Sequence, residues 1–397
     1  MKEGWEYKKL GEIATDMYRG SGIKRDQVTN EGFPCVRYGE IYTTYNVAFD
    51  SCVSHTKEEY ISSPKYFEFG DLLFAITGES VEDIGKTIAY LGNERCLCGG
   101  DIICMKHHQN PKYLAYALSA PDAIRQKGLG KTKLKVVHTN APALKAISIP
   151  LAPLSEQQSI VEYLDSAFAK IDAMKANAEK ALDEAKALFQ ASLKEMLEPK
   201  EGWEEKALKD LGQTQTGTTP SKSDKSNYGD YIEFIRPSEI DYDGNGRIDY
   251  NCEIKLSEQG ASKGRVFASN SILMVCIGAT IGKVGFSIKE VSCNQQINVF
   301  TPSNDLNYKF VYYAMRSPSF QHRVIKEGTS SQATLPIINK GKWEQLSISF
   351  PEIKEQEVIA THLDNLSSKV SDFKENYNKI SQECDALKQA ILRQVFE

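Results

Sequence analysis

The sequence predicts an α+β protein with two similar domains, each a mixed or antiparallel sheet with helices. Two long antiparallel coiled-coil helices separate the domains, and a pseudo-two-fold axis relates the two halves. Three observations support this prediction: the chain repeats itself, each copy ends in a long segment without proline, and apolar residues recur there with a coiled-coil period. The predicted boundaries are 1–152 and 199–350 for the domains, and 153–198 and 351–397 for the helices.

The repeat is strongest at the borders of the two copies. GWEYKKLGEI (4–13) returns as GWEEKALKDL (202–211), and ISIPLAPLSEQQSIVEYLD (147–165) returns as LSISFPEIKEQEVIATHLD (346–364). Between these borders the copies share only an outline of strands, then an amphipathic helix (113–126 and 308–324), then more strands. A shared border with divergent interiors indicates one framework that carries two different specificities.

One repeated stretch inside the copies resembles a nucleotide-binding loop. LFAITGESVEDIGKT (73–87) and ILMVCIGATIGKVGF (272–286) each hold an apolar strand, a glycine and then Gly-Lys. A phosphate loop needs four residues between its first glycine and the Gly-Lys pair, but the two copies have six and three. We therefore interpret Gly85-Lys86 and Gly282-Lys283 as turns between strands, each with a lysine at its tip.

The segments that close each copy predict the long helices. Ser155 and Gln158 can form a capping box at the first start. Apolar residues alternate by four and three along the second helix, and a shift of 199 residues gives the matching positions in the first. Because the first helix must carry the chain to the second domain, the second helix must run back along it, antiparallel. The predicted seams are Ile359, Leu363, Leu366, Val370, Phe373, Tyr377, Ile380, Cys384, Leu387 and Ile391, and Ile160, Leu164, Ala167, Ile171, Met174, Ala178, Ala181, Ala185, Leu188 and Ser192.

Composition is that of an ordinary globular protein, with 41% apolar and 25% charged residues and a net charge of −5. The two domain segments are balanced in charge, which permits nucleic-acid binding without requiring it. Nine cysteines and no export or membrane-spanning segment predict a cytoplasmic protein. Cys96, Cys98 and Cys104 lie near His107 and His108 but lack paired CxxC knuckles, so we favour buried strands over a zinc site.

Several motifs, in this order and duplicated at this spacing, carry a family resemblance. They are Trp-x-x-x-x-Leu at 5–10 and 203–208, TGTTPS (216–221), CNQQINVF (293–300), and the proline-containing approach to each Glu-Gln helix start. The first copy has RGSGIK and CGGD in place of TGTTPS and CNQQ. Across essentially its whole length the chain resembles the specificity subunit of Type I restriction–modification systems.

The resemblance implies two target recognition domains that each read one half of a bipartite double-stranded DNA target, with the helices setting their spacing. It also implies two modification subunits docked on the helices, and two restriction subunits that join them. S-adenosylmethionine, ATP and magnesium would belong to those partners, with neither catalysis nor a cofactor or metal in this chain. The chain has no glycine-rich S-adenosylmethionine motif and no Asn-Pro-Pro-Tyr, and NPKY (110–113) is a chance near match.

Candidate DNA contacts follow from residue type, since cations bind phosphates and amides or hydroxyls read base edges. KGLGKTKLK (127–135) supplies the main basic loop, unless it is an ordinary solvated surface run. The amides of 294–296 could instead tie their strand to a neighbouring loop. The candidates are Lys24, Arg25, Arg37, Tyr38, Lys86, Lys131, Lys133 and Lys135 in the first copy, and Thr218, Thr219, Ser221, Lys222, Lys283, Asn294, Gln295, Ser330, Ser331 and Gln332 in the second.

Two other classes of function remain open. A coiled-coil adaptor could use both domains to bind proteins without binding DNA, and the balanced domain charge suits it. A stand-alone methyltransferase or nuclease is disfavoured because the cofactor motifs are missing.

Overall fold

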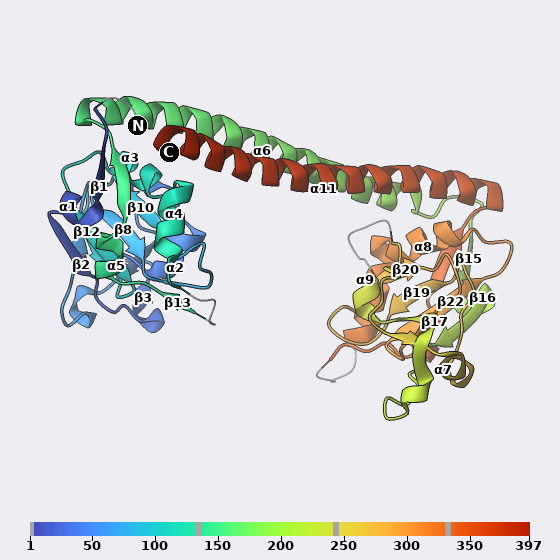
Figure 1. The fold of residues 1–397 in the computed structure, drawn as a ribbon. Helices are drawn as coiled ribbons and strands as arrows, with labels where there is room; N and C mark the ends of the chain where they lie inside the picture. Colours follow the sequence, from blue (N-terminus) through green and yellow to red (C-terminus); the bar gives the residue numbers. More distant parts are fainter. Residues whose placement is uncertain (1–3, 132–135, 241–245, 330–334) are drawn as a thin grey trace. The chain divides into compact units, whose positions relative to one another are not determined.

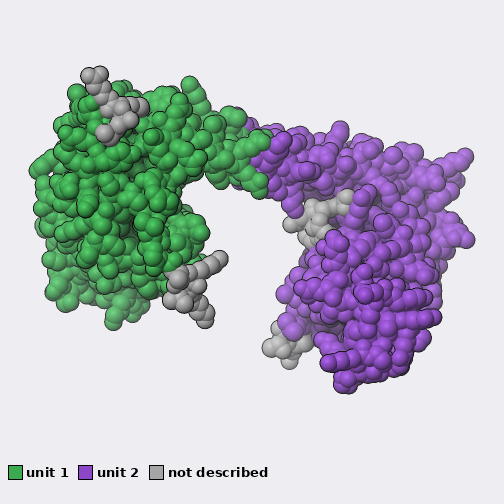
Figure 2. Space-filling model, viewed as in Figure 1, with its two compact units in different colours: residues 1–176, 380–397 green, residues 177–379 purple. Residues whose placement is uncertain are grey.

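The computed structural model describes residues 4–131, 136–240, 246–329 and 335–397. The chain forms two compact units, residues 1–176 with 380–397 (unit 1) and residues 177–379 (unit 2), shown in Figure 2. Two long helices, α6 (Leu154–Met196) and α11 (Ile353–Phe396), each contribute one part to each unit (Figure 1). The rest of each unit is a sheet-rich domain, which we call its head.

Head 1 is built on two five-stranded sheets. The first has the order β2-β12-β8-β10-β5 and the second has the order β3-β6-β4-β11-β7. The strands are β1 (Glu6–Lys9), β2 (Asp16–Arg19), β3 (Val28–Thr29), β4 (Phe33–Val36), β5 (Ala48–Phe49), β6 (Ser54–Thr56), β7 (Tyr66–Phe67), β8 (Leu72–Ala75), β9 (Thr77–Gly78), β10 (Thr87–Tyr90), β11 (Cys96–Cys98), β12 (Ile102–Lys106), β13 (Val137–His138) and β14 (Ser148–Leu151). The α-helices are α1 (Leu10–Ile13), α2 (Tyr38–Thr43), α3 (Pro111–Ala117), α4 (Pro121–Gly128) and α5 (Ala141–Lys145).

Head 2 repeats this plan with shorter sheets, of order β16-β22-β19-β20 and β18-β17-β21. Its strands are β15 (Glu204–Ala207), β16 (Gly212–Thr216), β17 (Tyr228–Ile235), β18 (Lys255–Leu256), β19 (Ile272–Val275), β20 (Val284–Phe286), β21 (Ser292–Cys293), β22 (Ile297–Pro302) and β23 (Ser347–Phe350). Its α-helices are α7 (Glu258–Lys263), α8 (Tyr308–Arg316), α9 (Pro318–Thr329) and α10 (Lys340–Trp343). Mixed sheets with helices confirm the predicted α+β class.

The repeated borders form the same small sheet in each unit. β1 pairs antiparallel with β14, and β15 pairs antiparallel with β23, so the first and last strands of a head lie together. Trp5 packs edge-on against Tyr113, with ring centroids 6.3 Å apart, and Trp203 packs in the same way on Phe310 at 6.0 Å. The repeated Trp-x-x-x-x-Leu motif therefore closes each head.

The repeated Glu-Gln and Leu-Asp pairs fasten each head to a long helix. The side-chain oxygen of the buried Gln157 accepts a hydrogen bond from Asn110 N, and that of Gln356 accepts one from Asn307 N, both at 2.9 Å. Asp165 accepts from Lys112 and Tyr116, as Asp364 does from Lys309 and Tyr313. NPKY therefore has a structural role: Asn110 caps α3, with its side chain accepting from Tyr113 N.

The long helices pair antiparallel, as predicted. In unit 1 the start of α6 lies against the end of α11, where Asp172 pairs with Lys388 and Lys175 pairs with Asp385. In unit 2 the end of α6 lies against the start of α11, in one apolar core with α8. Each helix also packs on a head, so the helix pair forms part of both cores.

The predicted seams are confirmed in part. Six of their residues are buried and six more are half-buried against the cores: Leu164, Ile171, Ile359, Leu363, Val370 and Cys384, and Ile160, Ala167, Ala185, Leu366, Ile380 and Ile391. Four other positions are wrong. Met174, Leu188, Phe373 and Leu387 are between 40% and 58% exposed. The buried residues are Gln157, Val161, Leu164, Phe168, Ile171, Leu182, Phe189 and Leu193 in α6, and Gln356, Ile359, Ala360, Leu363, Ser367, Val370, Cys384, Leu392 and Phe396 in α11. The period is as predicted, but the stripe is rotated because each helix faces a head as well as its partner helix.

The structure corrects two other local predictions. The amphipathic segments predicted as single helices are each divided in two, since Ala120 and Ser317 are extended before Pro121 and Pro318. Helix α6 begins at Leu154, so Ser155 lies inside its first turn and does not cap it. The side chain of Gln158 accepts from Asn110 and donates to Glu162 instead.

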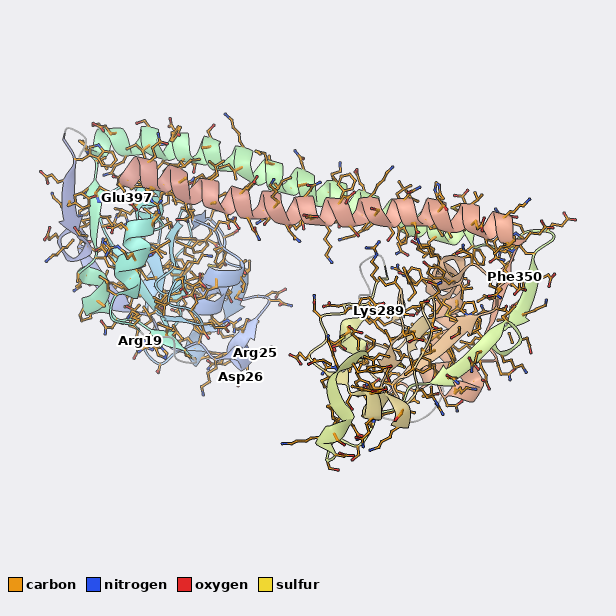
Figure 3. All side chains as sticks on the ribbon, turned by 45° about the vertical axis from the view of Figure 1, so that its right-hand side comes forward. Arg19, Arg25, Asp26, Lys289, Phe350 and Glu397 are labelled. Atoms are coloured by element: carbon orange, nitrogen blue, oxygen red, sulfur yellow. The ribbon has the colours of Figure 1, made fainter. Side chains whose placement is uncertain are left out.

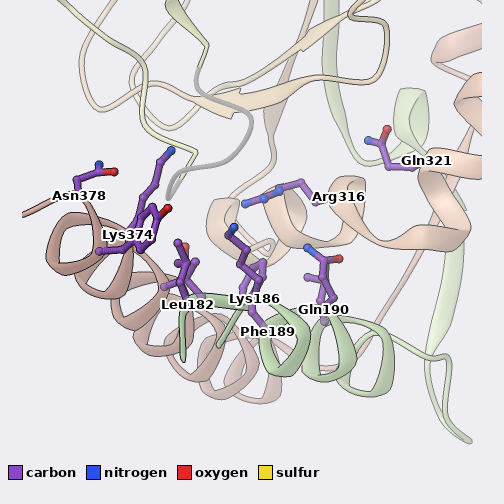
Figure 4. Close-up of a pocket in the computed structure, with 12 residues that line it drawn as sticks. Leu182, Lys186, Phe189, Gln190, Arg316, Gln321, Lys374 and Asn378 are labelled. Carbon is purple, nitrogen blue, oxygen red and sulfur yellow. The ribbon is translucent and has the colours of Figure 1, made fainter. Parts of the chain in front are cut away.

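The two helix–head junctions differ at one point. Phe168 of α6 packs edge-on against Tyr116 in unit 1, with centroids 5.4 Å apart, but its counterpart 199 residues later is Ser367. In unit 2 the long helices supply Phe189 as an aromatic partner of Tyr313, and the counterpart of Phe189 is Lys388. A groove of about 470 Å³ remains beside Ser367, between α6, α11 and the helices of head 2 (Figure 4).

Eight of the nine cysteines are buried, and Cys52 is half-buried. Cys96 and Cys98 lie on β11 and Cys104 on β12, all buried, which confirms the buried-strand interpretation. Burial lowers the pKa of His107 to about 4. Among the described residues, none of the helices contains an apolar run that could span a lipid bilayer.

Candidate nucleic-acid interface

In each head two neighbouring parallel strands end side by side, at the end of the sheet where their C-terminal residues lie. β4 runs parallel to β11 with Val36 opposite Cys98, and β17 runs parallel to β21 with Ile235 opposite Cys293. The residues that follow therefore emerge together: Arg37 beside Gly99 in head 1, and Arg236 beside Asn294 in head 2. We call this place the parallel-strand edge.

A glycine loop crosses the parallel-strand edge in both heads. Ser21 N donates to Cys98 O at 2.8 Å, and Thr218 N donates to Cys293 O at 2.9 Å. The preceding residues, Gly20 and Gly217, approach those carbonyls so closely that an added Cβ would overlap with backbone oxygen. RGSGIK and CGGD are therefore the structural counterparts of TGTTPS and CNQQ, although the sequences differ.

The structure adds a shared feature that the sequence analysis missed. Arg37 and Arg236 each begin an Arg-x-x-Glu segment, RYGE (37–40) and RPSE (236–239), separated by 199 residues. Glu40 and Glu239 are both only 7% exposed, and each accepts from the backbone N–H and the guanidinium of its arginine. The repeat offset and the apolar residues before each arginine were the signal that could have revealed the pair.

Four predicted contacts of head 1 gather around this edge. A hollow of about 510 Å³ is lined by Arg25, Arg37 and Tyr38, together with Gly22, Gly99 and Gly100. An adjoining hollow of about 430 Å³ is lined by Lys24, Arg19 and Lys65. Arg25 and Asp26 lie at the end of unit 1 away from the long helices (Figure 3). The prediction thus selected residues that the fold brings together.

The two Gly-Lys turns lie where predicted, but their lysines make internal contacts. Gly85 and Gly282 adopt positive φ angles of 72° and 90° at the ends of antiparallel hairpins. Lys86 Nζ donates to the carbonyl of Tyr45 at 3.0 Å, and Lys283 Nζ donates to that of Pro237 at 3.0 Å. Each lysine holds its hairpin against the segment that follows Arg37 or Arg236.

The basic loop of head 1 is shorter than predicted. Lys127 belongs to α4 and is buried, where its ammonium donates to Leu118 O at 2.8 Å and Thr87 Oγ1 at 3.1 Å. Burial lowers its pKa to about 7. Lys131 Nζ donates to His138 O at 2.8 Å, while Lys133 and Lys135 lie outside the described residues.

In head 2 several of the predicted contacts make hydrogen bonds within or between the loops. Thr219 donates to Gln295 Oε1, and Asn294 Nδ2 donates to Gln296 Oε1 at 2.9 Å, so these amides do tie loops together. Ser221 bonds with Ser223, and Lys222 is exposed. Thr218 Oγ1 is buried and has no hydrogen-bond partner in the described part of the chain. Ser330, Ser331 and Gln332 lie outside the described residues.

Electrostatics favour an ionised Arg–Glu pair in head 2. Burial alone would raise the pKa of Glu239, but hydrogen bonds from Arg236 and Ser238 outweigh it, and the net pKa is lowered. Because the carboxyl pKa is lowered, the pair stabilises the fold at every pH above the ordinary carboxyl pKa. That stabilisation is lost only as the pH falls through the lowered pKa. The edge offers fixed cations, amides and close-approaching backbone, a set of groups suited to binding a polyanion.

Comparison with protein families gives one match that occurs twice. The Type I restriction modification DNA specificity domain matches residues 2–183 and again residues 200–382. The two matches together cover well over half of the chain.

Individual relatives agree with that match. The chain is 34% identical over 152 residues to the Type I restriction enzyme HindI specificity subunit of Haemophilus influenzae; this covers 38% of the chain and 32% of that protein. It is 23% identical over 433 residues to the EcoBI specificity subunit of Escherichia coli, covering 99% of the chain and 86% of that protein.

Solved structures share the fold. A structure described as the basis of complex assembly and conformational transition of the type I R-M system has a TM-score of 0.78 at 18% identity, covering 99% of this chain and 97% of that one. The HsdS subunit from Thermoanaerobacter tengcongensis has a TM-score of 0.57 at 17% identity, covering 100% and 97%.

Proposed function

The chain belongs to the Type I restriction-modification DNA specificity family, and from this membership we propose that each unit reads one half of a bipartite DNA target. The two parallel-strand edges would carry the contacts. The long helices would set the separation of the half-sites and provide docking surfaces for modification subunits.

One observation carries this proposal: the two heads share a backbone frame but differ in the side chains placed on it. Gly20 and Gly217 cross the edge in the same way, yet Gly99-Gly100 in head 1 is replaced by Asn294-Gln295 in head 2. A common frame with different polar side chains is what two readers of different short sequences require. The site residues predicted from sequence remain the proposed contacts.

The partners follow from the family. We propose two modification subunits and two restriction subunits, which would supply adenine methylation and ATP-dependent cleavage with S-adenosylmethionine, ATP and magnesium. The chain itself would hold no cofactor and catalyse neither step. It would act in the cytoplasm, with double-stranded DNA as its ligand.

The test uses the chain co-purified with its modification subunits. Single-molecule methylome sequencing of cells carrying the system identifies the target. Fluorescence anisotropy then compares a duplex with that target, duplexes with either half scrambled, and one with an extra base pair between the halves. We expect each scrambled half and the altered spacing to weaken binding by at least about 10-fold, because a mismatched base pair costs about 1–3 kcal/mol.

The protein-adaptor alternative gives a different result. An adaptor would bind none of these duplexes above the level of a control protein of the same charge. Equal binding to all four duplexes would also contradict the proposal, since it would show that neither half nor the spacing is read.

A further inference from the structure

We propose that Arg37 and Arg236 form a matched pair of DNA-phosphate contacts, one in each unit, each held in position by a buried glutamate. The inference rests on the proposed function. It adds Arg236 and the two glutamates to the site, and it assigns Arg37, already a proposed contact, to the phosphate backbone instead of to a base.

The two arginines occupy the same place in the two heads. Each follows the last residue of one strand of a parallel pair, directly beside the residue that follows the other strand. Gly99 N donates to Val36 O at 2.9 Å, and Asn294 N donates to Ile235 O at 3.1 Å, which fixes the arginine against the edge.

Each glutamate holds its arginine in one conformation. Glu40 accepts from Arg37 N and Arg37 Nε, both at 3.1 Å. Glu239 accepts from Arg236 N at 2.8 Å and from Arg236 Nη2 at 2.7 Å. A guanidinium that is already ordered loses less conformational entropy when it binds a ligand, so Glu40 and Glu239 are positioning residues.

The guanidinium groups remain accessible. The side chains of Arg37 and Arg236 are 33% and 30% exposed. Arg37 lines the 510 Å³ hollow with Arg25, and the Lys283 ammonium donates to the carbonyl of Pro237, the residue after Arg236. Arg236 Nη2 also lies 3.6 Å from Oε2 of the exposed Glu253. Asp101 also lines the hollow but is paired with Arg19 at 2.7 Å.

The choice of phosphate over base follows from what the two heads share. The Arg-x-x-Glu segment is the same in both, whereas the residues within it differ, Tyr38-Gly39 against Pro237-Ser238. A residue placed identically in two heads that read different half-sites must contact what those half-sites have in common. Every half-site has the phosphate backbone, for which an arginine fork is well suited.

The experiment measures binding of the complex to target and scrambled duplexes over a range of salt concentrations. The variants are Arg37→Ala, Arg236→Ala and the double variant. The matched control is Arg125→Ala, which removes an exposed arginine from an i,i+3 pair with Asp122 on α4 of head 1, outside the proposed contacts and off the long helices. Each head variant should weaken binding to both duplexes by the same factor, about 10-fold. It should also reduce the slope of log affinity against log salt by about one, while the control changes neither.

Substituting the glutamates gives a second test, whose expected result differs from that of a purely structural role. Glu40→Gln should weaken binding when Arg37 is present and cause no further loss in the Arg37→Ala background. Arg37→Lys keeps the charge and should recover part of the salt slope, which keeps the test valid should the alanine variant fail to fold.

Two outcomes overturn the inference. An unchanged salt slope in a folded Arg37→Ala and Arg236→Ala complex would show that the pair only stabilises the head. A loss confined to one base pair of the target would show a base contact instead. If the unaltered complex binds neither duplex, the proposed function itself fails, which is a separate result.

Discussion

At the scale of single residues, Gly20 shows how closely the crossing loop approaches the parallel-strand edge. Its Cα faces the carbonyls of Cys98 and Gly99, where a Cβ would overlap with oxygen, and Gly217 has the same environment in head 2. Since the overlap is with backbone, no side-chain rotation can relieve it. The glycine is required by the close approach of two backbone segments.

We predict that Gly20→Ala lowers the free energy of unfolding by about 1–3 kcal/mol, because the loop must move away from β11. Gly22→Ala is the matched control in the same loop, where an added Cβ meets nothing within 4 Å. Thermal or denaturant unfolding measures both. Equal stability of the two variants would contradict the close approach.

Lys127 gives a prediction on pH. Its pKa is about 7 in the folded protein and 10.5 in the unfolded chain, so between these values the unfolded chain binds one more proton. The stability contributed by this site therefore rises with pH in that window. Relative to Lys127→Met, the native protein should gain up to about 1.4 kcal/mol per pH unit above pH 7. Denaturant unfolding at pH 7, 8 and 9 checks this, and a constant difference would contradict it.

Residue roles were predictable from sequence only where the neighbours are local. The Arg-x-x-Glu segments could have been found, since arginine and glutamate are three residues apart and recur at the repeat offset. The environment of Lys127 could not have been predicted, because its hydrogen-bond partners Thr87 and Leu118 lie elsewhere in the sequence. These contacts bury Lys127, although the residues that follow it belong to a loop.

At the scale of elements, the junction between each long helix and its head determines which side chains of α6 and α11 are buried. Phe168 is 9% exposed, touches Tyr116, and has the Lys388 ammonium 5.3 Å above its ring. In unit 2 the aromatic comes from Phe189, and Ser367 leaves the groove beside it. In both units α6 therefore provides the aromatic ring, so the two long helices are not interchangeable.

We predict that Phe168→Ala destabilises unit 1 by about 3–5 kcal/mol, since it removes a buried ring and leaves a cavity. The control is Met174→Ala in the same helix and the same unit, where a side chain 56% exposed should change stability by no more than about 0.5 kcal/mol. Hydrogen exchange of α3 amides would report the effect locally. A large effect of Met174→Ala would instead support the seam predicted from sequence.

The period of the long helices was predictable, but their rotation was not. A four-and-three alternation can be traced through Met174 and Leu188 or through their neighbours, because adjacent residues are only about 100° apart around a helix. The heads decide between these stripes by covering Phe168 and Phe189. Prolines explain the other local differences, since Pro121 and Pro318 end helices that apolar spacing alone would continue.

At the scale of the whole molecule, the sequence repeat predicted the organisation well because the repeated motifs are the ones that assemble each unit. Trp5 and Trp203 close the heads, and Gln157 and Gln356 fasten them to the long helices. The divergent interiors carry the loops around the parallel-strand edge. The half-site sequence that each head reads depends on the positions of the loop side chains and on DNA shape, and no sequence motif encodes either.

The central claim is that one unit reads one half-site. The direct measurement exchanges residues 1–150 for the corresponding block of another family member and maps adenine methylation across the genome. If each unit reads one half-site, the exchange yields a new bipartite target in which one half has changed and the other half and the spacing are retained. A target changed in both halves, or unchanged in both, would contradict it.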